Sequence, residues 1–254
     1  MKLVASLIVR NELDRYLPAC LDSLLGFCDD VAIVDDGSED ETLSFLAALG
    51  SRVHVLEQPE TTFFRHEGQA RNALLEFTLA LEPSHVLAID ADEFVSDPDA
   101  VRASCFGRQQ VFSLAMQEVW QANLAELRIR EDGGWRSHPV PCLYAVPPAR
   151  WRRRGEWRIA NRALACGREP TAVRRLHGKA KATGSDLLHF GWTDPANRAA
   201  RHERYRIADG GRYHQNAHLQ SILWPDDRVT LRSRPWPPSL EGYREALIPI
   251  GSPA

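Results

Sequence analysis

Short apolar runs alternate with helical patterns over the N-terminal part of this chain. Three runs are too short for helices and predict buried strands: residues 3–9, 31–34 and 53–56. Leucines at helical spacing lie between them. They predict one helix with Pro18 in its first turn and a second that Ser38 and Glu41 open at the spacing of a capping box. This alternation predicts right-handed βαβ crossovers and a parallel sheet.

A fourth apolar run, residues 85–89, ends abruptly in the acids Asp90, Asp92 and Glu93. Open α/β sheets bind their ligands at the carboxyl ends of such strands. Carboxylates crowded at that point repel one another unless a cation or hydrogen-bond donors offset their charge, and oxygen-only ligand sets suit Mg²⁺ or Mn²⁺. An ordinary acidic loop is the alternative, which an Asp-x-Asp pattern alone does not exclude.

Arg71 precedes this strand, in a helix predicted to start at Gly68 and to end near Leu81. A cation in the first turns of a helix opposes the helix dipole, which prefers acids there. The position of Arg71 therefore indicates a bound anion, with a solvated side chain as the alternative.

The pattern is less regular beyond residue 97. Strands are expected at residues 110–119, 127–130, 142–146 and 187–192. Thr193-Asp194-Pro195 supplies an N-cap and a first-turn proline for a helix that ends near Ile207. We therefore expect one large α/β domain made of two halves and an irregular C-terminal tail, over residues 1–97, 98–215 and 216–254.

Composition narrows the class of protein only slightly. The chain has 254 residues, 44% of them hydrophobic, which is enough for a sizeable core, and its net charge of -3 names no partner. Five cysteines without CxxC spacing favour a reducing cytoplasm over a disulfide framework or a zinc site. The first apolar run is only seven residues long, so it predicts a strand and neither a signal peptide nor a membrane span.

Residues 150–181 form the one strongly asymmetric segment, with eleven Lys or Arg against two acids. Trp151 and Trp157 are interleaved with its arginines. A solvated surface explains this pattern, and so does contact with an anionic acceptor such as nucleic acid, a glycan phosphate or a lipid phosphate.

Four motifs lie in order at the predicted strand and helix ends. They are Arg10-Asn11-Glu12, Asp35-Asp36-Gly37-Ser38, Gly68-Gln69-Ala70-Arg71-Asn72 and Asp90-Ala91-Asp92. Together they resemble a family 2 glycosyltransferase of the GT-A fold. The resemblance covers residues 1–97 well, and His189-Phe190-Gly191-Trp192 with the arginine-rich helix after it resembles the C-terminal part of bacterial and phage members.

This resemblance implies a Rossmann-like, mostly parallel sheet flanked by helices. It also implies transfer of a sugar, with inversion, from a nucleoside diphosphate-sugar such as a UDP-sugar to a hydroxyl acceptor, with Mn²⁺ or Mg²⁺. Residues 1–97 are then the half that binds the nucleotide-sugar, and residues 98–215 are the acceptor-side half.

The resemblance also implies roles for single residues. Those proposed for the donor are Asp35 at the nucleobase with Asp36 beside it, Arg10 and Glu12 near the base and ribose, Asp90 at the ribose or a metal-bound water, and Arg71 at the diphosphate. Asp92 is the implied metal ligand, and His189 completes the metal shell. A metal that bridges the phosphates of the leaving nucleotide stabilises charge that develops in the transition state.

The general base is the least determined role. An acceptor hydroxyl must lose a proton, and a carboxylate is the usual base. Asp132, with Glu131 before it, resembles the acidic pair at which GT-A enzymes place the base, although Gly133 and Gly134 equally predict a turn. Glu118, at a strand end, and Asp186, just before the strand that contains His189, are further candidates.

Three other functions stay open at this point. The same chemistry on hydroxymethylated bases of phage-type DNA fits the basic segment. A nucleotidyltransferase also uses a parallel sheet with paired aspartates, but the glycine-rich loop such enzymes carry after the first strand is absent here. The third is a non-catalytic binder of sugar nucleotides.

Overall fold

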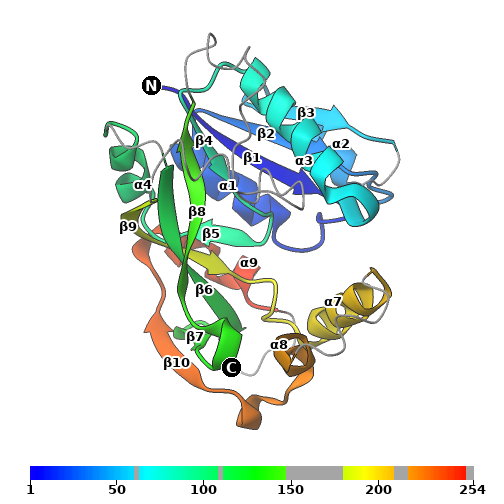
Figure 1. The fold of residues 1–254 in the computed structure, drawn as a ribbon, viewed down its shortest axis with the longest axis vertical. Helices are drawn as coiled ribbons and strands as arrows, with labels where there is room; N and C mark the ends of the chain where they lie inside the picture. The colour runs from blue at the N-terminus through cyan, green and yellow to red at the C-terminus, as the bar shows by residue number, and fades with distance from the viewer. Residues whose placement is uncertain (60–62, 108–110, 147–179, 209–216, 250–254) are drawn as a thin grey trace. The chain divides into compact units, whose positions relative to one another are not determined.

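The structure of the protein is a computed structural model that describes residues 1–59, 63–107, 111–146, 180–208 and 217–249 (Figure 1). Its chain divides into two compact units. The first unit is made of residues 1–91, 98–114 and 140–185, and the second of residues 92–97, 115–139 and 186–254. This division differs from the boundaries expected from the sequence, because the second unit takes chain from three separate stretches.

A parallel sheet forms the centre of the first unit. It runs in the order β4, β1, β2, β3, and an antiparallel strand, β8, lies beside β4. The bounds are β1 Leu3–Val9, β2 Asp30–Asp35, β3 Val53–Glu57, β4 His85–Ala88 and β8 His138–Ala145. The strands are continuous apolar runs because both faces are covered. The predicted α/β fold is confirmed.

Four helices of the first unit accompany the sheet (Figure 1): α1 Leu17–Phe27, α2 Thr42–Ala47, α3 Phe63–Ala80 and α4 Pro98–Ser104. Helix α1 has its proline in the first turn, as predicted. Helix α3 packs on β1 and β2. A buried hydrogen bond of 2.9 Å between the hydroxyls of Ser6 and Thr78 ties this helix to β1.

Two local predictions in this unit are wrong. Ser38 does not cap α2, because its hydroxyl donates to Asp35 instead, and the helix begins four residues later at Thr42. Helix α3 begins at Phe63, so Arg71 lies well inside it and not in its first turns. The helix-dipole argument for an anion at Arg71 therefore loses its basis.

The second unit contains an antiparallel ladder of β6, β7 and β10, and a pair formed by β5 and β9. Their bounds are β5 Glu93–Val95, β6 Val111–Ala122, β7 Glu126–Arg130, β9 Lys181–His189 and β10 Leu231–Pro235. Both β6 and β9 begin in the first unit. The strands were predicted from the sequence except for β5 and β10.

Helices of this unit lie in its C-terminal part: α7 Pro195–Ala208, α8 Ala217–Gln220 and α9 Arg244–Leu247. Short 3-10 turns cover Gly133–Trp135, Ser221–Leu223, Asp226–Arg228 and Pro238–Tyr243. Asp194 caps α7 as predicted, since its side chain accepts a 2.9 Å hydrogen bond from the amide of Ala196.

The C-terminal segment is more ordered than the predicted tail. Strand β10 pairs with β7 along its whole length, from Leu231 opposite Arg130 to Pro235 opposite Glu126. Trp236, Leu240 and Leu247 are buried beyond it. The expectation of an irregular tail is wrong for these residues, because weak periodicity in a proline-rich sequence hides an edge strand.

The basic segment is not tested by this structure. Residues 150–179 of the basic segment, with both of its tryptophans, lie outside the described residues. Among the described ranges, no helix combines the length and the apolar character needed to cross a bilayer.

Candidate active site

The carboxyl ends of β1 and β2 lie side by side in the first unit, with Val9 opposite Asp35. The loops that follow are bonded to each other. The amide of Asn11 donates to the Ser38 hydroxyl at 3.0 Å, and the Asn11 side chain accepts from the amide of Glu39 at 2.7 Å. Asn11 adopts a positive φ of 52°, which asparagine tolerates better than most residues. The predicted meeting of the first two motifs is therefore observed.

Asp35 is buried, and its carboxylate accepts two hydrogen bonds from Ser38, from the amide at 2.9 Å and from the hydroxyl at 2.5 Å. It therefore caps the turn after β2. The resemblance assigned Asp35 to the nucleobase, with Asp36 beside it. Asp36 is buried as well, and the nucleobase assignment stays a prediction.

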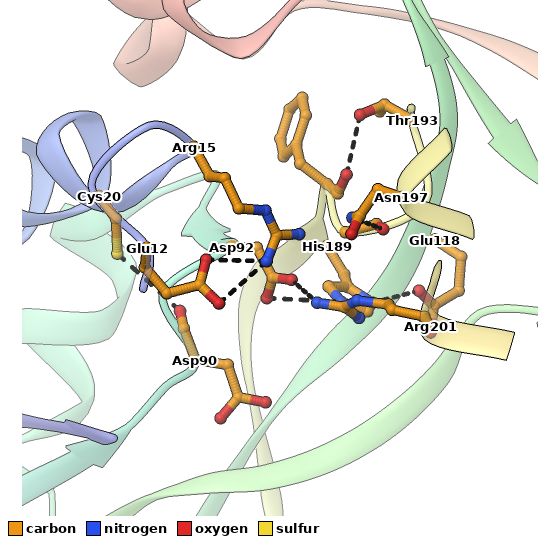
Figure 2. Close-up of polar contacts among 12 residues, drawn as sticks. Glu12, Arg15, Cys20, Asp90, Asp92, Glu118, His189, Thr193, Asn197 and Arg201 are labelled. Carbon is orange, nitrogen blue, oxygen red and sulfur yellow. Dashed lines mark hydrogen bonds and ion pairs between the residues drawn. The ribbon is translucent and has the colours of Figure 1, made fainter. Parts of the chain in front are cut away.

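The other donor residues of this unit are also fixed in place. Glu12 accepts two hydrogen bonds of 2.9 Å from Arg15 (Figure 2), and Arg10 lies 3.6 Å from Glu39. Arg71 is only 8% exposed, so the solvated alternative for it is excluded. The Asp90 carbonyl oxygen lies 3.9 Å from the thiol of Cys20 on α1.

Four charged side chains meet in the second unit (Figure 2). Asp92 follows β4 in the chain, Glu118 lies on β6, His189 ends β9 and Arg201 lies on α7. His189 is held between the two carboxylates, with Nδ1 2.6 Å from Glu118 and Nε2 3.5 Å from Asp92 Oδ1. Arg201 is ion-paired with the other Asp92 oxygen, Oδ2. We call these four residues the Asp92 cluster.

Backbone pairing holds the Asp92 cluster together. Glu93 of β5 lies opposite His189 of β9, and the amide of Phe190 donates to the Asp92 carbonyl at 2.8 Å. This register brings the side chains of Asp92 and His189 to the same end of the strand pair. The sequence placed Asp92 just after one strand and His189 inside another, and it gave no indication that β5 and β9 are paired.

The electrostatics of His189 follow from its two acidic neighbours. Burial alone disfavours a charged imidazole, but the charges of Glu118 and Asp92, with the hydrogen bonds to both, outweigh it and raise the His189 pKa to about 10. The imidazole is therefore protonated at neutral pH in the free protein. Two carboxylates and two cations then balance within the Asp92 cluster.

Gly191 is needed where the Asp92 cluster closes. A β-carbon at this position would lie 2.5 Å from Asp92 Oδ2 and 2.7 Å from both Arg201 Nη1 and His189 Nε2. No side chain fits at such distances unless the charged groups separate. Steric crowding therefore explains why the His189-Phe190-Gly191-Trp192 motif contains a glycine.

The Asp92 cluster offers donor atoms of the kind that bind a divalent cation, but it offers too few of them to complete a coordination shell. Asp92 Oδ1 and His189 Nε2 are close enough to bind one ion together, and the contact from Glu118 to Nδ1 is the support that metal-bound histidines usually have. Within the described ranges no group of three or more His, Cys, Asp or Glu could hold a metal. Mg²⁺ and Mn²⁺ fit this pair if substrate phosphates and waters supply the remaining ligands.

Aromatic residues enclose a second buried charge next to the Asp92 cluster. Arg130 is fully buried, with its guanidinium carbon 4.4 Å from the ring centre of Trp120 and 4.6 Å from that of Trp135. Trp135 packs edge to face on Trp192, which itself lies against His189. Trp120 and Trp135 are thus core residues.

Asp132 is the counter-ion of Arg130. Its two oxygens each accept a hydrogen bond of 2.8 Å from that guanidinium, and these bonds lower the pKa of Asp132. Its carboxylate also accepts from the amide of Thr230 at 3.1 Å. A carboxylate with these hydrogen bonds and a lowered pKa is a weak base, which argues against Asp132 as the catalytic base. The assignment of the base stays a prediction.

Glu118 and Glu131, two other candidate bases, also interact with neighbouring side chains. Glu118 orients His189. Glu131 is ion-paired with Arg232, which also donates to Gln117 at 2.9 Å. Because neighbouring residues of a strand point to opposite faces, Gln117 lies on the face of β6 that is turned away from Glu118.

Sequence reasoning missed Arg201 and the steric role of Gly191. The arginine-rich helix after the histidine motif was recognised as part of a resemblance, but nothing distinguished Arg201 from the other arginines of α7. Only the side-chain geometry singles it out, because Arg206 on the same helix pairs with Glu203 instead.

A parallel α/β sheet with buried acids at its strand ends is the architecture expected of the GT-A fold. Residues 6–103 match the model described as glycosyl transferase family 2. The resemblance predicted from the motifs is confirmed by this match.

Two mycobacterial proteins are similar to most of this chain. Uncharacterized proteins Rv3786c of Mycobacterium tuberculosis and Mb3815c of Mycobacterium bovis are each 26% identical over 217 residues, which cover 82% of this chain and 51% of theirs. The chain thus spans about half the length of the curated relatives it matches.

Among solved structures, S. aureus TarS 1-349 matches with 18% identity and a TM-score of 0.52, covering 88% of this chain and 69% of that one. The same TarS fragment in complex with UDP-GlcNAc matches with 16% identity, a TM-score of 0.50, and 88% and 70% coverage. At such identities the likeness shows the fold, and it confirms GT-A architecture.

We expect Gly191→Ala to destabilise the second unit by about 1–3 kcal/mol, the usual range for overpacking a tight site. The added methyl group must separate Asp92, His189 and Arg201. Gly242→Ala is the matched control, since a β-carbon there meets nothing within 4 Å. Urea unfolding of both variants checks this, and equal stability of the two would contradict the described packing.

Asp132→Ala leaves the buried Arg130 without its carboxylate, so we expect a loss of about 3 kcal/mol of folding stability. Glu131→Ala, which breaks an ion pair with the half-exposed Arg232, should cost less than about 1 kcal/mol. Thermal unfolding measures both. If Asp132→Ala keeps wild-type stability but loses sugar transfer, the catalytic assignment is right and the anchoring role is wrong.

Proposed function

We propose that the protein is a metal-dependent glycosyltransferase that moves a sugar from a nucleoside diphosphate-sugar to a hydroxyl acceptor. The observation that carries this proposal is the Asp92–His189 pair, backed by Glu118, with Asp92 inside the segment that matches the glycosyl transferase family 2 model. A UDP-sugar is the first donor to test, because TarS, of the same fold, was solved in complex with UDP-GlcNAc.

The nucleoside is assigned to the strand ends of the first unit. Arg10, Glu12 and the neighbouring pair Asp35 and Asp36 are the residues proposed at the base and ribose. Their loops are tied to one another by the Asn11 and Ser38 hydrogen bonds, which supports a preformed pocket wall. Arg71 is proposed at the diphosphate, in keeping with its burial.

Asp92 and His189 are the proposed protein ligands of Mn²⁺ or Mg²⁺, with Asp90 near a metal-bound water. When bound, the ion neutralises the charge that develops on the departing nucleoside diphosphate. His189 must give up its Nε2 proton to act as a ligand, while Glu118 keeps accepting from Nδ1 and so fixes the ring orientation.

Transfer with inversion requires the acceptor oxygen to attack the anomeric carbon on the face opposite the leaving group. A base removes the acceptor proton as the new bond forms, and the nucleoside diphosphate carries away the electron pair of the broken bond. The Trp120, Trp135 and Trp192 cluster packs beside the Asp92 cluster and limits access of water from that side.

The test is release of UDP from UDP-sugars in the presence of Mn²⁺, with and without candidate hydroxyl acceptors. We expect release that EDTA stops and Mn²⁺ restores. Asp92→Asn should lower turnover at least about 100-fold, because it removes a metal ligand. Asp227→Asn, an exposed aspartate of the same unit, is the control and should keep wild-type turnover.

The outcomes separate the remaining alternatives. Donor binding without UDP release with any acceptor or water would indicate a non-catalytic sugar-nucleotide binder. No binding of UDP-, GDP- or dTDP-sugars with or without metal would contradict the proposal. Turnover that persists in EDTA would contradict the metal dependence alone.

A further inference from the structure

Arg201 lies against both residues of the proposed metal site. Its Nη2 is ion-paired with Asp92 Oδ2, and its Nη1 lies 3.4 Å from His189 Nε2. Both partners are nearly buried, with the Asp92 and Arg201 side chains 6% and 14% exposed. A guanidinium thus stands against both proposed metal ligands in the free protein (Figure 2).

The two carboxylates of the Asp92 cluster explain why the cationic side chain of Arg201 is held there. Two carboxylates in a mostly buried place repel each other, and their burial is costly unless opposite charges lie beside them. Arg201 supplies such a charge through its ion pair with Asp92. A divalent ion bound by Asp92 would place a second cation beside the Arg201 guanidinium, and the two would repel each other.

Arg201 is placed so that its guanidinium can change partners without moving its helix. Helix α7 is anchored at its start, where Asp194 caps it and the Asn197 amide donates to the Gly191 carbonyl at 2.9 Å. The guanidinium carbon of Arg201 lies 5.0 Å from the ring centre of Trp192. The planar fork of an arginine pairs equally well with a carboxylate or a phosphate.

We propose that Arg201 is an exchangeable counter-ion that holds Asp92 in the free protein and passes to the donor diphosphate when metal and nucleotide bind. This inference rests on the proposed function. Arg201 is then a donor-binding residue as well as the group that keeps Asp92 from binding metal alone.

The exchange couples the two ligands. A metal that arrives alone must displace Arg201 from Asp92 and loses the stabilisation of that ion pair. A diphosphate offers Arg201 a new partner and supplies further oxygens to the metal. The two ligands therefore favour each other's binding, and linkage requires the effect to be reciprocal.

The direct test is titration of Mn²⁺ into the protein, followed by the loss of the free Mn²⁺ signal in electron paramagnetic resonance, with and without UDP. We expect Arg201→Gln to bind Mn²⁺ alone about tenfold more tightly than the wild type, within the usual range of coupling effects. UDP should then tighten Mn²⁺ binding less in this variant than in the wild type.

The matched control is Arg206→Gln, which removes the same charge from the same helix at an exposed position paired with Glu203. It should leave Mn²⁺ affinity within about twofold of the wild type, because exposed charges act weakly at a distance. A merely structural Arg201 predicts the opposite sign for Arg201→Gln, namely weaker Mn²⁺ binding with and without UDP. That result, or unchanged affinity without UDP, would overturn the inference.

A second measurement serves if Arg201→Gln does not fold. In EDTA, Asp92→Asn frees Arg201 for the phosphates, so UDP should bind more tightly than to the wild type. Arg201→Lys combined with Asp92→Asn should lose most of this gain in UDP affinity, since a lysine lacks the paired N–H donors of a guanidinium. An equal gain in both would refute the exchange. Absence of UDP binding to the wild type with Mn²⁺ would instead refute the proposed function.

Discussion

The buried carboxylate of Asp92 is the constraint on which the rest of the second unit depends. Such a charge is stable only with opposite charges and hydrogen bonds around it. The chain provides them from three distant places, as Glu118 on β6 supports His189 on β9, and Arg201 comes from α7. Gly191 has no side chain because these groups leave no room for one.

In the first unit, hydrogen bonds fix the loops that follow the parallel strands. Ser38 bonds to Asp35 on one side and receives the amide of Asn11 on the other, so one serine joins two neighbouring loops. Preorganised loops of this kind lose little conformational entropy when a ligand binds. Ser38, which the sequence predicts to cap a helix, joins these loops instead.

Much of the fold could be predicted because continuous apolar strands and leucine-spaced helices are local patterns. The Asp92–His189 meeting could be expected only by resemblance, since it depends on β5 pairing with β9 across a long stretch of chain. Arg201 could not be singled out, as one arginine among several on α7 becomes distinctive only through its contacts. Asp132 looked like a base because the sequence does not show that Arg130 is buried beside it.

The central claim is that Asp92 and His189 hold the metal of a donor nucleotide. Pulsed electron paramagnetic resonance of the Mn²⁺–UDP complex tests it most directly, with the histidines of the protein labelled with ¹⁵N. The account predicts a coupling of Mn²⁺ to one histidine nitrogen together with a coupling to phosphorus, and loss of the nitrogen coupling in His189→Gln. A phosphorus coupling without any histidine nitrogen, or a nitrogen coupling that persists in His189→Gln, would contradict it.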